Sequence, residues 1–148
     1  RPYYEPGVRD LQRRFKDFAG TGAYYDAAEW MAQDMSRFVK DVRVIVPIPG
    51  HNGYAESGIR YIAHALQEIT GANYQNVLEG MYRPSLWQVK KAGGDVRKVD
   101  LGLELKQGYQ FMRNVPVLLI DNCIDTGTTM RAAMKLFDDA KFLAHAYT

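Results

Sequence analysis

The 148-residue sequence predicts a single α/β domain with three layers, in which helices flank a central, mostly parallel β-sheet. Two short apolar segments, 42–46 and 117–120, each lead through a polar loop into a segment with helical periodicity. Strands that alternate with helices form parallel sheets, and near-continuous apolar strands are typical of sheets covered on both faces. We divide this domain into an N-terminal helical segment, 1–41, packed on a core, 42–148.

Composition and charge exclude several classes of protein. The 47% of hydrophobic residues can bury a core, which argues against disorder. A net charge of +2 gives no reason to expect bulk binding of nucleic acid. No apolar run approaches the ~20 residues that cross a membrane. The single cysteine, Cys123, excludes an internal disulfide and a multi-cysteine zinc site. No secretory signal is recognisable, so we expect a cytoplasmic protein without a membrane partner.

Two amphipathic helices are expected before the first strand. Apolar residues recur at helical spacing at Val8, Leu11, Phe15, Phe18 and Ala19, and again at Ala28, Met31, Met35, Phe38 and Val39. Between them, residues 20–22 predict a turn, and Asp26 is a candidate N-cap of the second helix. Aromatic residues of this region suit either a homodimer face or a cover over the sheet; they are Tyr3, Tyr4, Tyr24 and Tyr25.

The first strand, 42–46, is β-branched and apolar, and it ends in a segment rich in proline and glycine. The prolines and glycines of residues 47–53 forbid regular structure there. A third helix is expected over 54–69, with Gly71 as its stop and with one apolar side. That side consists of Ala55, Ile59, Ile62, Ala63, Leu66 and Ile69. Residues 76–79 are the best candidate for the next strand, and residues 101–113 are ambiguous.

Residues 83–98 form a basic segment. Five of them are basic (Arg83, Lys90, Lys91, Arg97 and Lys98), against Asp95 as the one acid, a net charge of +4. Because the segment also contains Gly93-Gly94, we expect a mobile basic loop or a strand pair with a flexible tip. Contact with nucleic-acid phosphates, helped by Tyr82 and Trp87 nearby, is a weaker alternative.

The last strand–helix unit is the clearest. Residues 117–120 predict a short buried strand, 121–129 a polar loop, and 142–146 a closing strand. The helix between them has an inward stripe of Met130, Ala133, Met134 and Phe137.

Ligands of open α/β sheets bind beyond the carboxyl ends of the strands, where the sequence places two loops, 47–53 and 121–129. The second contains Asp125-Thr126-Gly127-Thr128-Thr129, three hydroxyls and a glycine where a helix begins. Free N–H groups and the helix dipole there suit a phosphate dianion, and Gly127 lets the backbone approach it closely. No lysine precedes the threonines, so this is not the phosphate loop of ATPases. The plainer interpretation is an ordinary helix capped by Thr126 or Thr128.

The complete stretch 117–129, Val-Leu-Leu-Ile-Asp-Asn-Cys-Ile-Asp-Thr-Gly-Thr-Thr, resembles a known signature. It is similar to the signature of type I phosphoribosyltransferases, which bind 5-phosphoribosyl 1-pyrophosphate (PRPP). That signature has four apolar residues, two acidic residues, and then Asp-Thr-Gly-x-Thr. Val46-Pro47-Ile48-Pro49, followed by a Gly/His loop and a helix, is most similar to the competence-associated ComF-like branch, whose first strand also ends in Pro-x-Pro. Together the two elements cover about residues 42–137, although the part between them is only loosely similar.

The resemblance implies an enzyme that transfers the phosphoribosyl group of PRPP to a nitrogenous base, with release of pyrophosphate. It implies that Asp121 and Asn122 face the ribose hydroxyls and that residues 49–53, with Gly50 and His51, cradle the pyrophosphate. The 5′-phosphate would be held by Asp125, Thr126, Gly127, Thr128 and Thr129. Asp125 also matches a position near the incoming base that is a proposed proton acceptor in some members. His51 could equally be a plain turn residue.

The same resemblance places the basic segment where the family has a flexible catalytic loop. Its Lys90, Lys91, Arg97 or Lys98 would close over the departing pyrophosphate, with Lys90 and Arg97 as our catalytic candidates. The resemblance also implies Mg²⁺ with PRPP, bound mostly by substrate oxygens and by Asp121 from the protein.

Asn122 departs from the family pattern, which has two acids. An amide can hydrogen-bond a hydroxyl, but it supplies no second negative charge near an oxocarbenium-like centre. The alternative function is therefore a non-catalytic regulator that senses PRPP or nucleotides, or a ComF-like accessory protein associated with nucleic acid.

Overall fold

The computed structural model describes residues 1–17 and 22–148. Its central sheet has four strands in the order β2-β1-β5-β6, and all three neighbouring pairs are parallel. These strands are β1 (Val44–Pro47), β2 (Asn73–Tyr74), β5 (Val117–Ile124) and β6 (Ala140–Tyr147). The predicted α/β class is therefore confirmed. The central sheet, which was predicted to be mostly parallel, is parallel throughout.

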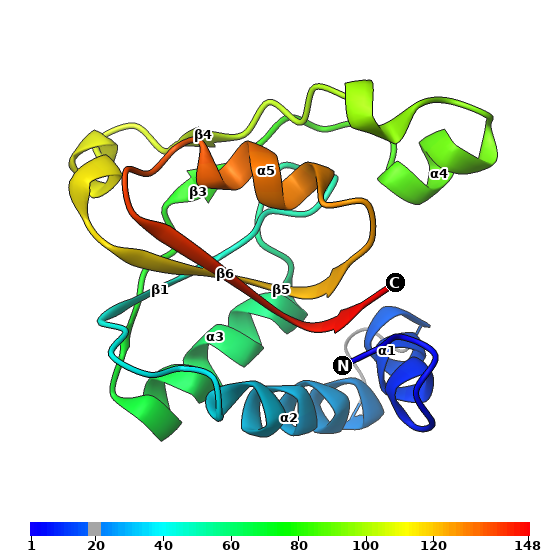
Figure 1. The fold of residues 1–148 in the computed structure, drawn as a ribbon, viewed down its shortest axis with the longest axis horizontal. Helices are drawn as coiled ribbons and strands as arrows, with labels where there is room; N and C mark the ends of the chain where they lie inside the picture. Colours follow the sequence, from blue (N-terminus) through cyan, green and yellow to red (C-terminus); the bar gives the residue numbers. More distant parts are fainter. Residues whose placement is uncertain (18–21) are drawn as a thin grey trace.

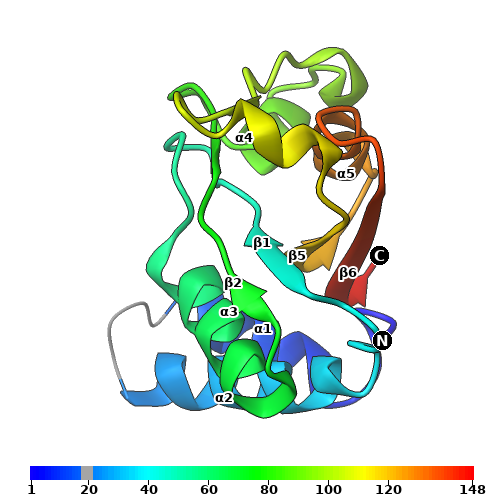
Figure 2. The same cartoon turned by 90° about the vertical axis from the view of Figure 1, so that its left-hand side faces the viewer.

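Helices flank this sheet, in an arrangement compatible with the three predicted layers (Figures 1 and 2). One face carries α1 (Val8–Asp17), α2 (Gly22–Ser36) and α3 (Ser57–Thr70). The other face carries α5 (Thr128–Met134) and a small antiparallel pair, β3 (Leu78–Glu79) with β4 (Glu104–Leu105). In the part of the chain described, no helix is long and apolar enough to cross a membrane.

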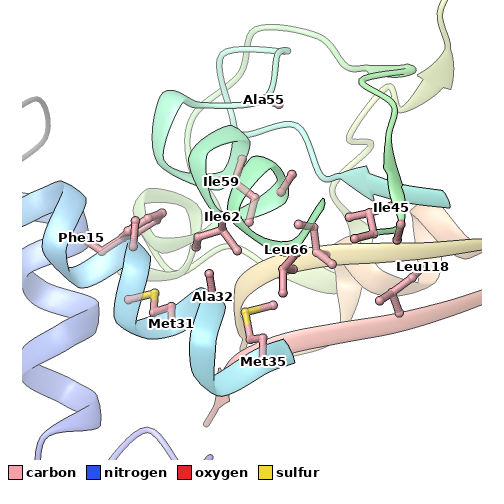
Figure 3. Packing of buried hydrophobic residues seen from close by; sticks show 14 of the residues in the cluster. Phe15, Met31, Ala32, Met35, Ile45, Ala55, Ile59, Ile62, Leu66 and Leu118 are labelled. Carbon is pink, nitrogen blue, oxygen red and sulfur yellow. The ribbon is translucent and has the colours of Figure 1, made fainter. Parts of the chain in front are cut away.

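The side chains of β1 and β5 alternate between the two apolar cores. Ile45, Leu118 and Ile120 pack with α2 and α3, where Met31, Ile62 and Leu66 meet them (Figure 3). Val46 and Leu119 point to the opposite face and pack with residues of α5 and β3. Because both faces of these strands are buried, their sequences are almost continuously apolar.

The two N-terminal helices are present, with different ends from those predicted. Phe18, Ala19, Gly20 and Thr21 lie outside the described residues. Because α2 begins at Gly22, Asp26 lies inside the helix, and its prediction as an N-cap is wrong. Phe38 follows the end of α2 and is 69% exposed, so it does not belong to the buried stripe. Tyr24 is buried and stacks on Phe15, which makes it a core residue.

The third helix, α3, begins three residues later than predicted and ends at the predicted stop. Gly71 has a φ of 77°, in the left-handed region, and its N–H donates to the Gln67 carbonyl. Ile69, predicted on the apolar side, is exposed. The strand predicted at 76–79 is confirmed as β3, but it belongs to the small second sheet. The two-residue strand β2 was not predicted because it lacks an apolar pattern. Residues 101–113 contain β4 and the start of a 3₁₀ helix, η2 (Gln110–Asn114).

The basic segment contains helix α4 (Leu86–Lys91) and a 3₁₀ turn, η1 (Val96–Lys98), so the predicted strand pair is wrong. The physical reason is a capping box at the start of α4. The Gln88 N–H donates to Ser85 Oγ at 3.2 Å, and the Ser85 N–H donates to Gln88 Oε1 at 2.8 Å. A Ser-x-x-Gln pattern is the sequence signature of such a helix start.

Strand β5 continues four residues beyond its predicted end. It pairs with β6 from Val117 opposite Ala140 to Ile124 opposite Tyr147, so 121–124 are strand and only 125–127 are loop. Helix α5 then begins at Thr128 and ends before Phe137, which is still buried. This longer pairing determines on which face each candidate site residue lies.

Candidate functional site

The two loops singled out in the sequence lie at one edge of the sheet. From β1 the chain passes through α3 to β2 on one side, whereas β5 pairs with β1 on the other side. Such a reversal of strand order is the topological switch point where α/β proteins bind ligands. The Ile48 N–H donates to the Ile120 carbonyl at 3.0 Å, which joins the carboxyl ends of β1 and β5 directly.

A small pocket of about 90 Å³ lies at the end of β5. It brings together six of the predicted site residues: Asp121, Asp125, Thr126, Gly127, Thr128 and Thr129. Leu86 of α4 and Val96 of η1 line the same pocket, so the basic segment forms part of its wall. Gly50, His51, Lys90, Arg97 and Asn122 are not among its lining residues.

The turn from β5 to α5 is shaped by Gly127, whose φ is 79°. A Cβ at this glycine would lie 2.8 Å from Arg131 Nη1, and that same nitrogen donates to the Thr126 carbonyl at 3.2 Å. The hydroxyls of Thr126 and Thr128 are 2.9 Å apart and hydrogen-bonded to each other. Gly127 itself is the N-cap, without a side-chain hydrogen bond, so the interpretation of either threonine as the cap is wrong.

Asp121 has its carboxyl group on the pocket side of β5. The Asn122 N–H donates to Asp121 Oδ1 at 2.8 Å. Burial raises the pKa of Asp121 to about 7, and the negative charge of Glu56 raises it further, whereas the Asn122 N–H opposes the rise. Near neutral pH this carboxyl therefore exists both with and without its proton.

Glu56 is a site residue that the sequence reasoning missed. It is the N-cap residue of α3, and a Cβ built on Gly50 would lie 2.7 Å from its Oε1. Its charge acts on Asp121, so the carboxylate that accompanies Asp121 comes from the loop after β1. The signal in the sequence was an acid at the start of the helix that follows a candidate loop.

Asn122 faces the opposite side of β5 from Asp121. Its Nδ2 donates to Gln12 Oε1 at 2.9 Å, and its carbonyl accepts from Gln12 Nε2 at 3.1 Å. Successive residues of a strand point to opposite faces, and the extension of β5 through Ile124 imposes this alternation here. The structure therefore does not bring the Asn122 side chain together with Asp121, as a shared contact with the ribose would require.

The loop after β1 is held by the segment that precedes α4. The Gly50 N–H donates to the Tyr54 carbonyl at 2.9 Å, and the His51 carbonyl accepts from the Arg83 N–H at 3.0 Å. Gly53, with a φ of 93°, packs so closely that an added Cβ would lie 2.6 Å from the Gly80 carbonyl oxygen. Gly50 and His51 thus lie in a tightly constrained loop at the same sheet edge as Asp121.

The two catalytic candidates of the basic segment, Lys90 and Arg97, differ in their contacts. Lys90 Nζ in α4 lies 3.7 Å from Asp125 Oδ2, so the structure brings Lys90 to the turn. Both side chains are more than half exposed, and such a pair adds little stability. Arg97 makes no ion pair in the part of the chain that the structure describes. Arg83, part of the same basic segment, has a buried Nε without a partner among the described atoms, and burial lowers its pKa.

The donor atoms present suit a hard cation that keeps most of its ligands from water or substrate. No group of three or more His, Cys, Asp or Glu side chains in the described residues has the arrangement of a metal site. The neighbouring carboxyls of Asp121 and Glu56 can still give Mg²⁺ one or two oxygens, which is how this ion is often held beside phosphates.

Comparison of the chain with models of known protein families finds no match, and comparison with curated proteins finds no significant relative.

Proposed function

We propose that the chain is a phosphoribosyltransferase-like protein, similar to the ComF-like branch, that binds PRPP or a nucleotide 5′-phosphate at the turn 125–129. In this proposal it transfers the phosphoribosyl group to a nitrogenous base and releases pyrophosphate. One observation carries the proposal. Asp121 and the turn 125–129 line a single pocket at the switch point, where α/β proteins bind ligands, with a basic segment against it.

The turn supplies groups that suit a phosphate. The hydroxyls of Thr126, Thr128 and Thr129 lie around a glycine that allows close approach of the backbone. The Thr126 and Thr128 hydroxyls bond to each other, and a phosphate oxygen that accepts from either hydroxyl would replace that contact. Arg131, whose Nη1 binds the Thr126 carbonyl, adds a positive charge behind the turn.

Asp121 and Glu56 would serve the ribose and the reacting carbon. Asp121 can accept a hydrogen bond from a ribose hydroxyl, and the ionised pair can stabilise positive charge that develops at C1′. Mg²⁺, when bound with PRPP, would neutralise charge on the pyrophosphate as it leaves.

The basic segment would act on the leaving group. A base nitrogen attacks C1′, the bond from C1′ to the pyrophosphate oxygen breaks, and pyrophosphate departs with the electron pair. The proton of the attacking nitrogen would pass to Asp125. Lys90 Nζ lies 3.7 Å from Asp125 Oδ2, so a small movement of α4 can bring the Lys90 ammonium group into contact with the pyrophosphate. Arg97 remains a predicted second contact of the pyrophosphate. Gly50 and His51 remain its predicted contacts from the loop after β1.

A second candidate function is non-catalytic sensing of PRPP or nucleotides, and a specific observation favours it. Asn122 supplies no second carboxylate beside Asp121, because its side chain binds Gln12 on the other face of the sheet. This arrangement retains the phosphate turn and reduces the charge available to the reaction.

Calorimetric titration with PRPP, with and without Mg²⁺, tests the binding site. Thr128→Val should weaken binding by ~1–3 kcal/mol, because a charged oxygen loses its hydrogen bond. Thr128→Ser keeps the hydroxyl and is the matched control, with nearly unchanged affinity. Equal affinity of the Val and Ser variants would contradict the proposed site.

Pyrophosphate release across a panel of free bases then separates the two candidate functions. The enzyme should show turnover that Asp121→Asn abolishes. A sensor should bind PRPP at the turn 125–129 with a similar affinity, and it should release no pyrophosphate with any base. Turnover that survives Asp121→Asn would show that the ribose site is elsewhere.

A further inference from the structure

A second cavity lies on the opposite side of the sheet from the candidate site. It is a groove of about 470 Å³ between α1 and α2, with the buried His145 of β6 among its lining residues (Figure 1 shows the two helices). A volume of 300–1,000 Å³ is typical of sites for small organic ligands, whereas the pocket at the end of β5 is much smaller. The groove therefore has room for a ligand of the size of a mononucleotide.

Two arginines, Arg14 and Arg37, give the groove a positive character. Arg14 of α1 and Arg37, the residue that follows α2, both line it, and neither makes an ion pair or side-chain hydrogen bond within the described part of the chain. Asp34, which also lines the groove, is already bound to Arg1 and to His145 Nε2, at 2.9 Å from the latter. Its charge is thus compensated locally, and the guanidinium groups of Arg14 and Arg37 remain available to a phosphate.

An aromatic side chain adjoins these charges. Trp30 lines the groove from α2 and is 65% exposed, so its indole is accessible to a ligand. Arg37 lies in the turn just after α2 and lines the same groove as Trp30. One indole and two guanidinium groups that line the same groove suit a planar base that carries a phosphate. Asp10 on the α1 side adds an acceptor for a ribose hydroxyl or an exocyclic amine.

A chain of hydrogen bonds connects this groove with the strand that carries Asp121. From Asp34, the chain passes to His145 Nε2, and His145 Nδ1 lies 3.2 Å from Gln12 Nε2. Gln12 in turn holds Asn122 through two hydrogen bonds. His145 and Gln12 are almost fully buried, so water does not compete for these bonds.

We propose that the groove between α1 and α2 is a second ligand site, specific for a nucleoside monophosphate. Arg14 and Arg37 bind its phosphate, and Trp30 stacks on its base. Its occupancy alters the affinity of the turn 125–129 through His145, Gln12 and Asn122. The binding at the groove is independent of the function proposed above, and only this coupling depends on it.

The two tryptophans of the chain allow the sites to be observed separately. In a Trp87→Phe background, Trp30 is the one remaining indole and reports on the groove. Titration with AMP, GMP, CMP and UMP should quench its fluorescence saturably, and the matching nucleosides or inorganic phosphate alone should bind at least about tenfold more weakly. Equally tight binding of inorganic phosphate would overturn the nucleotide assignment.

Variants then locate the binding. Arg14→Ala with Arg37→Ala should weaken nucleotide binding at least about tenfold, because each charged contact is lost. Arg13→Ala removes a charge from the same helix outside the groove, and it should leave the affinity unchanged. Thr128→Val should also leave the Trp30 signal unchanged. Loss of binding only in Thr128→Val would overturn the groove site and leave the function proposed for the turn intact.

The coupling is measured by titrating PRPP with the groove empty and with it saturated by the nucleotide. The apparent PRPP affinity should change by ~5–150-fold, the usual range for coupled sites. Gln12→Met keeps the size of the side chain and breaks the hydrogen-bond chain, so both ligands should bind without influencing each other. Thermal unfolding of this variant confirms that it is folded. An unchanged PRPP affinity in the original chain would overturn the coupling, whether or not the groove binds nucleotide.

Discussion

Gln12 of α1 holds Asn122 of β5 at both its side chain and its main chain. The Gln12 Oε1 accepts from Asn122 Nδ2 at 2.9 Å, and Gln12 Nε2 donates to the Asn122 carbonyl at 3.1 Å. Because Nε2 also faces His145 Nδ1, the Gln12 amide has one favourable orientation. Position 122 therefore requires a hydrogen-bond donor toward α1, which an asparagine has and an ionised aspartate lacks.

Asn122→Asp should lower the free energy of unfolding at neutral pH by ~1–3 kcal/mol, because a carboxylate would oppose the Gln12 carbonyl oxygen. If Gln12 turns its amide to donate to the carboxylate, it loses its hydrogen bond to His145 Nδ1. Urea denaturation measures the change. Asn114→Asp, at an exposed position, is the matched control and should cost little. Equal stability of Asn122→Asp and the original chain would contradict the described contact.

Asp121→Asn should stabilise the protein above neutral pH and have little effect near pH 4. The folded-state pKa of Asp121 is about 7, against an ordinary value of 3.8. Between these values the unfolded chain releases a proton that the folded chain retains, so stability falls as pH rises through this window. The asparagine removes that loss, and we expect a gain of roughly 2–4 kcal/mol at pH 8.

Denaturation curves at pH 4, 6 and 8 for both proteins test this difference. Taking the difference between the proteins removes the effect of His145, whose pKa is lowered mainly by burial and whose protonation in the unfolded chain destabilises the fold on the acid side. A difference that does not grow with pH would show that Asp121 titrates normally.

Residues 90–98 should exchange their amide hydrogens faster without ligand than with PRPP and Mg²⁺. In the described residues, one exposed ion pair, Lys90 with Asp125, joins this segment to the turn, and Val96 lines the same pocket. Such contacts hold a segment weakly. Bound pyrophosphate would add charged contacts and slow the exchange, as for a closing lid. The amides of the core helix α3 serve as the internal control. Identical exchange of 90–98 in both states would rule out closure over the ligand.

Gly53→Ala should destabilise the protein more than Gly71→Ala, although both glycines have a positive φ. At Gly71 an added methyl group meets open space, so only the backbone conformation costs energy, ~1–2 kcal/mol. At Gly53 the same methyl group would lie 2.6 Å from the Gly80 carbonyl oxygen, which adds ~1–3 kcal/mol of overpacking. Equal losses in chemical denaturation would show that the loop after β1 moves away freely from residues 80–83.

Elements whose pattern is local and complete could be predicted from the sequence. The apolar segments of β1 and β5, the helical periodicity of α3 and its stop at Gly71 follow from burial and backbone conformation within a few residues. The polar turn after β5 was also predictable, because its threonines and glycine follow a strand whose carboxyl end is the usual place for a ligand. Helix α4 was predictable in principle from Ser85 and Gln88.

The contacts between polar side chains of the site depend on tertiary packing and could not be predicted. The family resemblance predicted that Asn122 and Asp121 face one ligand, yet β5 continues to Ile124 and turns adjacent side chains to opposite faces. The partner of Asn122 is Gln12, 110 positions away, and Asp121 is influenced by Glu56 from another loop. These contacts depend on which strand lies beside β1 and which helix covers the sheet. Since the free energy of that packing is spread over the whole core, no local sequence pattern specifies it.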